Sequence, residues 1–277
     1  MKTTSMKLFF LAMASALGLA STAATAGPLV TDWQYTVNAR FDTSSPTFSS
    51  SGGSQYVSSD MISWGAANAN PAPVNTGNSD TSRSGITITN TPATGSVVTN
   101  GAAGAVNTYT HYNNAISGTF GTLQTATVNS TLTLTSISPV TGVSYGPVTV
   151  SYAINFLETP NTTPCVAASP TPCNDIFVIE GLLNNAFTVD GNTYYASFFE
   201  SSNALTPLPN AVCEAASAAD NCLGFTTVEG QANAFTFNLL ITSAPVTVNV
   251  PEPSSLALLG LGLAAVAASR RRGQKQA

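Results

Sequence analysis

Apolar and polar residues alternate along several segments of this chain, with the period of two that puts every second side chain on one face of a β-strand. The alternation is found in residues 33–41, 86–88, 126–134, 148–156 and 235–241. Between Gly27 and Val250 we find no convincing helical period. These patterns predict an all-β protein built from half-buried antiparallel strands.

Turn and loop residues separate these segments. Asp190-Gly191 lies between Phe187-Thr188-Val189 and Tyr194-Tyr195, which is a typical sequence for a two-residue β-hairpin. Residues 44–59 and 66–84 are rich in Asn, Ser, Pro and Gly, and we expect them to form long loops. The expected architecture is an antiparallel β-sandwich, jelly-roll-like, with long loops.

The N-terminus has the three parts of a secretory signal peptide. Lys2 and Lys7 precede the apolar run Leu8 to Leu19, and Ala24-Thr25-Ala26 supplies small residues at the positions that a signal peptidase reads. We therefore predict a signal peptide at residues 1–26 and a mature chain that starts at Gly27. The exported body would comprise residues 27–249, long enough to bury one sizeable core.

The C-terminal segment 250–277 also has three parts. Val250-Pro251-Glu252-Pro253 is followed by sixteen uncharged residues at 254–269 and then by Arg270-Arg271-Arg272. As a helix, the apolar segment would span about 24 Å, which is short of the ~30 Å hydrocarbon core of a bilayer. The arginines place the C-terminus on the cytoplasmic side. We expect transient insertion into the inner membrane, and an ordinary membrane anchor is the alternative.

Removal of both ends leaves a strongly acidic body. The whole chain has a formal net charge of −5, but only Arg40 and Arg83 of its eight Lys and Arg residues lie in the body. Twelve of the thirteen Asp and Glu residues lie there, so the body carries a net charge of about −10. Nucleic acids and anionic lipids are poor partners for such a surface. Its solvation must come mainly from Ser, Thr and Asn.

The four cysteines belong to two similar stretches, about 155–189 and 197–238. Each contains Phe, Glu and Asn, then two cysteines, then Glu-Gly and Asn-Ala-Phe-Thr, and in both the Glu-Gly pair begins seven residues after the second cysteine. This order predicts an internal duplication of strand, cysteine loop, strand, turn and strand. Chance matching in a sequence rich in Asn, Ala and Thr is the alternative.

The duplication predicts how the cysteines pair. If both copies fold alike, Cys165 pairs with Cys173 and Cys213 with Cys222, in the oxidising compartment that an exported chain reaches. A zinc site is disfavoured, because seven and eight intervening residues exceed the usual two to four and the chain has one histidine. We therefore predict two disulfides and no metal or other cofactor.

Two family resemblances follow from these residues. The tail, with Pro251, Glu252 and Pro253, resembles a PEP-CTERM sorting signal. Thr110, His111 and Asn113 match the Thr-His-x-Asn pattern of the THxN family of PEP-CTERM proteins, and the stretches 173–177 and 222–230 are similar to that family. The resemblance implies transient recognition by an exosortase in a Gram-negative bacterium that makes exopolysaccharide, with the tail cut or transferred and the protein left on the cell surface or in the extracellular matrix. It carries no established activity.

The single histidine has two interpretations. On a strand, Thr110 and Tyr112 would share one face and His111 and Asn113 the other. We favour a hydrogen-bonded structural network over a ligand site, and the chain lacks the Gly-x-Ser-x-Gly elbow of many hydrolases. We therefore expect a non-catalytic protein, not an enzyme, associated with exopolysaccharide.

The carboxylates suggest the alternative, a carbohydrate-binding module or a carbohydrate-active hydrolase. Two carboxylates across a cleft can hydrolyse a glycosidic bond, and the duplicated stretches repeat Glu158, Glu180, Glu200 and Glu229. Such a groove would need Trp33, Trp64 or paired tyrosines as its lining. Calcium at Asp175, Asp190 and Asp220 is chemically reasonable, although the chain has no Asp-x-Asp-x-Asp-Gly loop.

Overall fold

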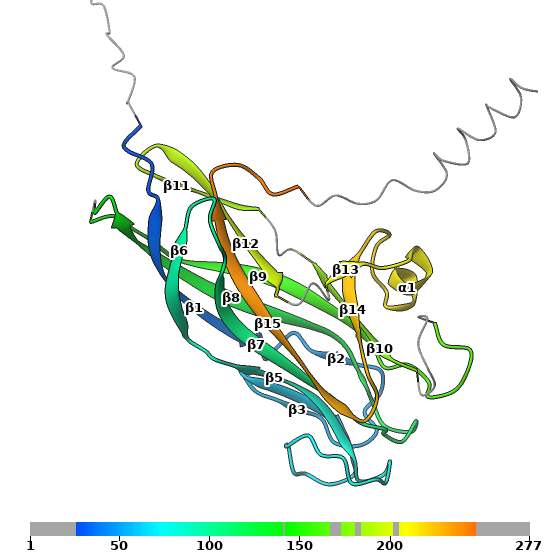
Figure 1. Cartoon of the computed structure of the whole chain (residues 1–277). Helices are drawn as coiled ribbons and strands as arrows, with labels where there is room; N and C mark the ends of the chain where they lie inside the picture. The colour runs from blue at the N-terminus through cyan, green and yellow to red at the C-terminus, as the bar shows by residue number, and fades with distance from the viewer. Residues whose placement is uncertain (1–25, 141, 167–172, 181–183, 202–204, 248–277) are drawn as a thin grey trace, which may run out of the picture.

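The computed structural model describes residues 26–140, 142–166, 173–180, 184–201 and 205–247. These residues fold into two antiparallel β-sheets with one short helix, which confirms the expected all-β class (Figure 1). The predicted signal peptide, up to residue 25, and the predicted tail helix 254–269 lie outside the described residues. The described residues contain no helix that is long and apolar enough to cross a membrane.

The first sheet is built around two long strands. Its spatial order is β13 (Thr206–Pro207), β14 (Leu223–Thr227), β10 (Asp175–Glu180), β9 (Ser144–Leu157), β8 (Leu123–Ser138), β1 (Asp32–Phe41) and β6 (Ala93–Val98). The short strand β2 (Thr47–Phe48) pairs with β8 as well. Strands β8, β9 and β10 are consecutive neighbours, so this part of the sheet is formed by simple antiparallel connections.

The second sheet lies against the first. Its spatial order is β11 (Asn185–Val189), β12 (Asn192–Glu200), β15 (Gln231–Thr242), β7 (Gly104–Asn113), β5 (Arg83–Thr89), β4 (Met61–Gly65) and β3 (Tyr56–Val57). Strand β7 runs through its centre, between β15 and β5. This central position buries the inward face of β7, which carries His111 and Asn113.

The main core lies between the two sheets and follows from the alternating pattern. Along β1 the apolar residues of the alternation are buried while most intervening polar residues are exposed or half-buried. Trp33 has no exposed surface and packs edge-on against Tyr194 and Phe187, with ring centroids 5.2 and 6.0 Å away. Its indole nitrogen donates to Thr99 Oγ1 at 3.0 Å, so its polar atom is satisfied as well.

The predicted hairpin is present between β11 and β12. Asp190 and Gly191 both have positive φ, 48° and 77°, which is the backbone that a two-residue type I′ turn requires. Val189 pairs with Asn192 directly across the turn. Glycine reaches this conformation without a steric penalty and aspartate tolerates it, so the residue types at the turn set the register of the two strands.

The two segments expected to be long loops, 44–59 and 66–84, are pinned by one buried side chain. The structure adds the short strands β2 and β3 to the first segment and begins β5 at Arg83, inside the second. Arg83 is 1% exposed. Its guanidinium donates to Ser54 O and Asn68 O, both at 2.8 Å, and to Ser63 Oγ at 3.2 Å. These bonds tie both loops to the sheet.

One element departs from the sequence prediction. A six-residue helix, α1 (Asn210–Ala215), covers the outer face of the first sheet beside β10. Ile176 and Val178 pack beneath it with the Cys213–Cys222 disulfide, while Phe177 and Ile179 face the main core. Strand β10 is therefore buried on both faces. The helix escaped the sequence analysis because six residues are too few to establish a helical period.

Both predicted disulfides, Cys165–Cys173 and Cys213–Cys222, are present, so the local pairing is confirmed. The proposed duplication maps onto β9, β10 and β11 in the first copy and β12, β14 and β15 in the second. Strands β10 and β14 are neighbours, and β11 and β15 flank β12. The first strands of the copies, β9 and β12, lie in different sheets. The duplication itself stays a prediction.

Candidate functional site

His111 projects from the middle strand of the second sheet into the aromatic core. It is 2% exposed, and its ring stacks on Trp64 at a centroid distance of 5.9 Å and an interplanar angle of 17°. Phe156 and Phe177 contact it edge-on at 5.3 and 4.8 Å. Because burial penalises the charged form, the pKa of His111 is lowered to about 3. The imidazole is therefore neutral at physiological pH.

The two buried members of the Thr-His-x-Asn motif, His111 and Asn113, both contact Thr227. His111 Nδ1 lies 2.9 Å from Thr227 Oγ1, and Asn113 Nδ2 donates to Thr227 O at 3.1 Å. Both bonds cross from β7 in the second sheet to the end of β14 in the first. Thr110 is half-buried on the opposite face of β7, as the alternation predicted. The motif thus joins the two sheets through Thr227.

Beside Thr227 lie three carboxylates from three different segments. Glu158 directly follows β9, Asp175 begins β10, and Glu229 follows β14. Asp175 and Thr227 are paired across β10 and β14. One oxygen of each carboxylate lies within 4.8 Å of the others. Glu158 and Glu229 are half-buried, whereas Asp175 has no exposed surface. We call this group the carboxylate cluster.

The hydrogen bonds of the carboxylate cluster satisfy only part of its oxygens. Asp175 Oδ1 accepts from the backbone nitrogen of Thr159 at 2.9 Å, and Glu158 Oε2 accepts from the indole nitrogen of Trp64 at 3.1 Å. Asp175 Oδ2 and both carboxylate oxygens of Glu229 are shielded from solvent; Asp175 Oδ2 has no hydrogen-bond partner among the described residues, and Glu229 has only the nearby side chain of Asn161. An enclosed acceptor without a donor is costly, so these atoms call for an explanation.

The electrostatics of the carboxylate cluster favour protonation or a cation. Burial raises the pKa of Glu158 to about 8. The hydrogen bond from Trp64 opposes this rise, and the charge of Glu229 adds to it. Burial, followed by the charge of Glu158, raises the pKa of Asp175 well above its usual value. Burial also raises the pKa of Glu229, opposed by the side chain of Asn161. Like charges held close together in a poorly solvated place resist ionisation.

Trp64 connects His111 with the carboxylate cluster. It has no exposed surface, stacks on His111 with one ring face and donates to Glu158 with its nitrogen. His111 in turn bonds to Thr227, which is paired with Asp175. The Thr-His-x-Asn motif and the carboxylate cluster therefore form one continuous network at the same end of the first sheet.

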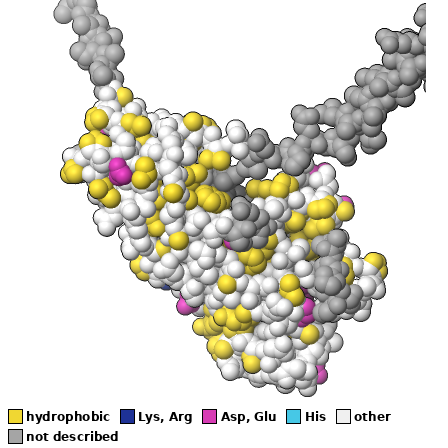
Figure 2. Space-filling model, viewed as in Figure 1, with side chains coloured by type: hydrophobic (Ala, Val, Ile, Leu, Met, Phe, Trp, Pro, Cys, Tyr) yellow, Lys and Arg dark blue, Asp and Glu magenta, His cyan; other side chains and the backbone are white. Residues whose placement is uncertain are grey.

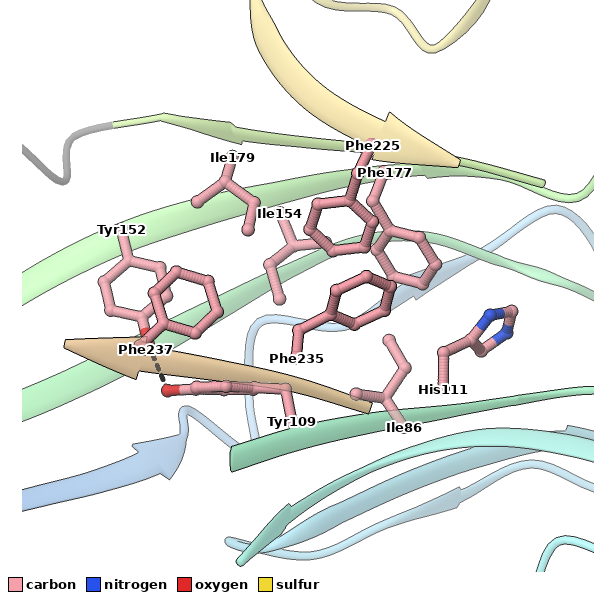
Figure 3. A pocket seen from close by; sticks show the side chains of 10 residues that line it. All are labelled: Ile86, Tyr109, His111, Tyr152, Ile154, Phe177, Ile179, Phe225, Phe235 and Phe237. Carbon is pink, nitrogen blue, oxygen red and sulfur yellow. Dashed lines mark hydrogen bonds between the residues drawn. The ribbon is translucent and has the colours of Figure 1, made fainter. Parts of the chain in front are cut away.

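The apolar space on the other side of His111 is part of the core. Figure 3 shows His111 at one end of a row of aromatic and aliphatic side chains that includes Phe177, Phe225 and Phe235. At its far end the hydroxyls of Tyr109 and Tyr152 are hydrogen-bonded to each other (Figure 3). The cavity measures about 20 Å³, room for little more than one water molecule. It is too small for an organic ligand.

Several residues considered as candidates from the sequence lie elsewhere. Glu180 is exposed at the opposite end of β10 from Asp175, roughly 16 Å along the strand. Glu200 ends β12 and pairs with Phe237 of β15. Asp190 is in the β11–β12 turn, and Asp220 lies between α1 and β14. Trp33 and Trp64 are both fully buried, so neither provides a surface platform for a sugar. In the face shown in Figure 2, acidic side chains are scattered.

Sequence reasoning missed the grouping of Asp175 with Glu158 and Glu229. The repeat pointed instead to glutamates at equivalent positions. One signal was available in the sequence: Asp175 immediately precedes four apolar residues, Ile176 to Ile179, that form a fully buried strand. An acid at the start of such a strand is drawn into a poorly solvated place, where it needs a partner.

The low pKa of His111 predicts a loss of stability in acid. The imidazole takes up a proton near pH 6.5 in the unfolded chain and near pH 3 in the folded protein. Between these values the unfolded state binds more protons, so the free energy of unfolding falls as the pH falls. Between pH 6.5 and 4.5, wild type should lose roughly 2–3 kcal/mol more than His111→Gln in urea unfolding.

The comparison with His111→Gln isolates the imidazole. The groups that face His111 are the rings of Trp64, Phe156 and Phe177 and the hydroxyl of Thr227. The raised pKa values of the nearby carboxylates act in the opposite direction, because their folded forms bind more protons, and this contribution is common to both proteins. Equal acid sensitivity of the two proteins would contradict the prediction.

Comparison with known proteins identifies the tail. Residues 249–272 match the family described as the PEP-CTERM protein-sorting motif. The match includes Pro251, Glu252 and Pro253, the apolar segment and Arg270 to Arg272. A comparison with curated proteins found no match for the chain. The motif marks the chain as an exported protein whose C-terminal tail is processed by an exosortase.

Proposed function

We propose that this chain is a non-catalytic protein of the cell surface or biofilm matrix, delivered there by exosortase processing of its tail. The observation that carries the proposal is the sorting motif at residues 249–272. It directly follows a two-sheet body held by two disulfides, whose last strand, β15, ends at Thr242. A stable folded domain followed by a cleavable sorting signal is what we expect of an exported structural protein.

The environment of the reactive side chains supports a non-catalytic role. His111 is enclosed by three aromatic rings, and both nitrogens lie in the core, away from any substrate. All four cysteines are oxidised. Asp175 and the carboxylate oxygens of Glu229 are shielded from solvent, so they are poorly placed to reach a glycosidic bond.

The role of the Thr-His-x-Asn motif supports membership of the THxN family. His111 and Asn113 both bind Thr227, and Thr227 lies in the second of the two cysteine-containing stretches. A short motif that anchors one sheet to the other explains why the motif and the cysteine stretches would occur together in such proteins. This is a structural role for the motif, without a catalytic one.

The surface composition supports contact with polysaccharide. The exported body carries only Arg40 and Arg83 as basic residues, and Arg83 is buried. The exposed faces of the long strands β8 and β9 present Thr, Ser and Asn hydroxyls and amides, which donate and accept hydrogen bonds as sugars do. In the face shown in Figure 2, most atoms belong to the backbone or to side chains that are neither hydrophobic nor charged. We therefore propose neutral exopolysaccharide as the partner after release.

Processing predicts the mass of the exported protein. In a host that has an exosortase, the mature chain should lack residues 1–26 and most of the segment after Pro253, as measured by intact-mass spectrometry. A variant with Pro251, Glu252 and Pro253 all changed to alanine should keep its tail, because the recognition residues are gone. Surface-released wild-type protein that still carries Arg270 to Arg272 would contradict the proposal.

A further inference from the structure

We propose that Glu158, Asp175 and Glu229 bind a divalent cation, and that the cation is calcium. This site is independent of the sorting tail and is not assigned by the resemblance to sorted proteins. The three residues bring the end of β9, the start of β10 and the turn between β14 and β15 to one point. Figure 1 shows β9, β10 and β14 side by side in the first sheet.

The first argument is that the carboxylate oxygens of the cluster have too few hydrogen-bond donors. Asp175 has no exposed surface, and its Oδ1 is held by the nitrogen and the hydroxyl of Thr159, at 2.9 and 3.4 Å. Its Oδ2 has no donor among the described residues, and both oxygens of Glu229 are shielded from solvent with only the side chain of Asn161 close enough to lower the pKa of Glu229. A bound cation would satisfy all three atoms at once, which no single hydrogen-bond donor could do.

The second argument is that neither arginine of the body lies beside the carboxylate cluster as a counter-ion. The described body offers two arginines as counter-ions. Arg83 directs its donors to Ser54, Ser63 and Asn68, and Arg40 donates to Ser59 Oγ at 3.2 Å. Neither guanidinium serves the carboxylate cluster. Three carboxylates enclosed together need a positive charge, and a metal ion is the common alternative to a basic side chain.

The third argument is the spacing and chemistry of the ligand atoms, which suit calcium. Calcium binds oxygen at about 2.3–2.6 Å, so two ligand oxygens on one ion are at most about 5 Å apart. The ligand oxygens of the carboxylate cluster lie within 4.8 Å of one another. Magnesium and zinc bind oxygen at about 2.0–2.2 Å, so two ligand oxygens on either ion lie at most about 4.4 Å apart, inside this limit. An all-oxygen set of ligands also suits calcium better than zinc.

A surface groove reaches Glu158, and buried side chains support the carboxylate cluster. Glu158 lines a surface groove of about 310 Å³ together with Thr47, Ser49, Thr125 and Ser217. Water in this groove can complete the six to eight oxygen ligands that calcium takes. Behind the cluster, Trp64 holds Glu158, and His111 and Asn113 hold Thr227 beside Asp175. Partners of this kind orient metal ligands.

The direct test is calcium binding by the exported protein after exhaustive treatment with a chelator. Isothermal titration with calcium chloride should give one site per chain, and 1 mM calcium should raise the Tm by several degrees over the chelated protein. Magnesium at the same concentration should give a smaller shift. Absence of a heat and of a Tm shift at 10 mM calcium would overturn the proposal, as would a larger response to magnesium or zinc.

Two variants locate the site. Glu229→Gln and Asp175→Asn preserve the shape of each side chain and should weaken calcium binding at least about 100-fold, because each removes a charged ligand. In chelator, both should melt at or above the wild-type temperature, since a crowded and poorly solvated carboxyl group is removed. Glu180→Gln, on an exposed residue of the same strand, is the matched control and should bind like wild type. Wild-type affinity in both cluster variants would overturn the assignment.

A spectroscopic test does not depend on altering the ligands. Terbium replaces calcium in oxygen sites, and a nearby indole sensitises its luminescence. Trp64 is hydrogen-bonded to Glu158 at 3.1 Å, whereas Trp33 contacts Phe187 and Tyr194. Terbium luminescence excited through tryptophan should therefore be displaced by calcium, fall steeply in Trp64→Phe and persist in Trp33→Phe. The opposite dependence on the two tryptophans would place the ion elsewhere and overturn the proposal.

Discussion

Replacing Trp64 with alanine is expected to lower the free energy of unfolding by about 3–5 kcal/mol, the usual cost of removing a buried indole. Trp64 has no exposed surface and packs against both His111 and Phe156, with ring centroids 5.9 and 5.2 Å away. The substitution would also leave Glu158 without its only described hydrogen-bond donor. Urea unfolding at pH 7, followed by far-ultraviolet circular dichroism, measures the loss.

A second variant separates packing from the hydrogen bond. Trp64→Phe keeps much of the aromatic contact but has no nitrogen to donate to Glu158, so it should cost less, about 1–3 kcal/mol. If Trp64→Ala lost less than about 1 kcal/mol, the indole would not be a central part of the core. Equal losses in the two variants would assign the effect to the hydrogen bond instead of the packing.

Replacing Arg83 with methionine is expected to cost about 3–4 kcal/mol, although methionine can fill much of the same space. Three acceptors, Ser54 O, Ser63 Oγ and Asn68 O, lose a charged donor, and such bonds are worth about 1.5–3 kcal/mol each. Burial of the guanidinium is itself unfavourable and lowers the pKa of Arg83. Removing the buried charge therefore offsets part of the stability that is lost with the three hydrogen bonds. Urea unfolding again gives the magnitude.

The same substitution should loosen two surface segments. Residues 44–59 and 66–82 are held to the sheet through Arg83, so limited proteolysis should cut them faster in Arg83→Met than in wild type. Arg83→Lys should recover only part of the stability, because an ammonium cannot reproduce the planar fork. Arg40→Met, at an exposed arginine, is the control and should change stability by less than about 0.5 kcal/mol. Similar behaviour of the two methionine variants would contradict the anchoring role.

Several elements of this protein follow from local patterns in its sequence. Period-two alternation is a local property, so the pattern of residues 33–41 predicts β1 without information about the neighbouring strands. Asp190-Gly191 set the hairpin because these residue types tolerate positive φ. Cysteines eight and nine residues apart pair locally. The sorting motif occupies one contiguous stretch, 249–272, so it is identified from the sequence without reference to the fold.

The contacts between these elements depend on the tertiary structure. Alternation places His111 on the buried face of β7, but it does not say that Trp64 and Thr227 meet it there. Glu158, Asp175 and Glu229 come from three separate segments, and their proximity depends on the pairing of β10 with β9 and β14. Arg83 resembles a solvated surface charge in the sequence and is buried beneath two loops. Burial and pairing are properties of the assembled sheets, because the free energy of a buried charge depends on neighbours that are distant in the sequence.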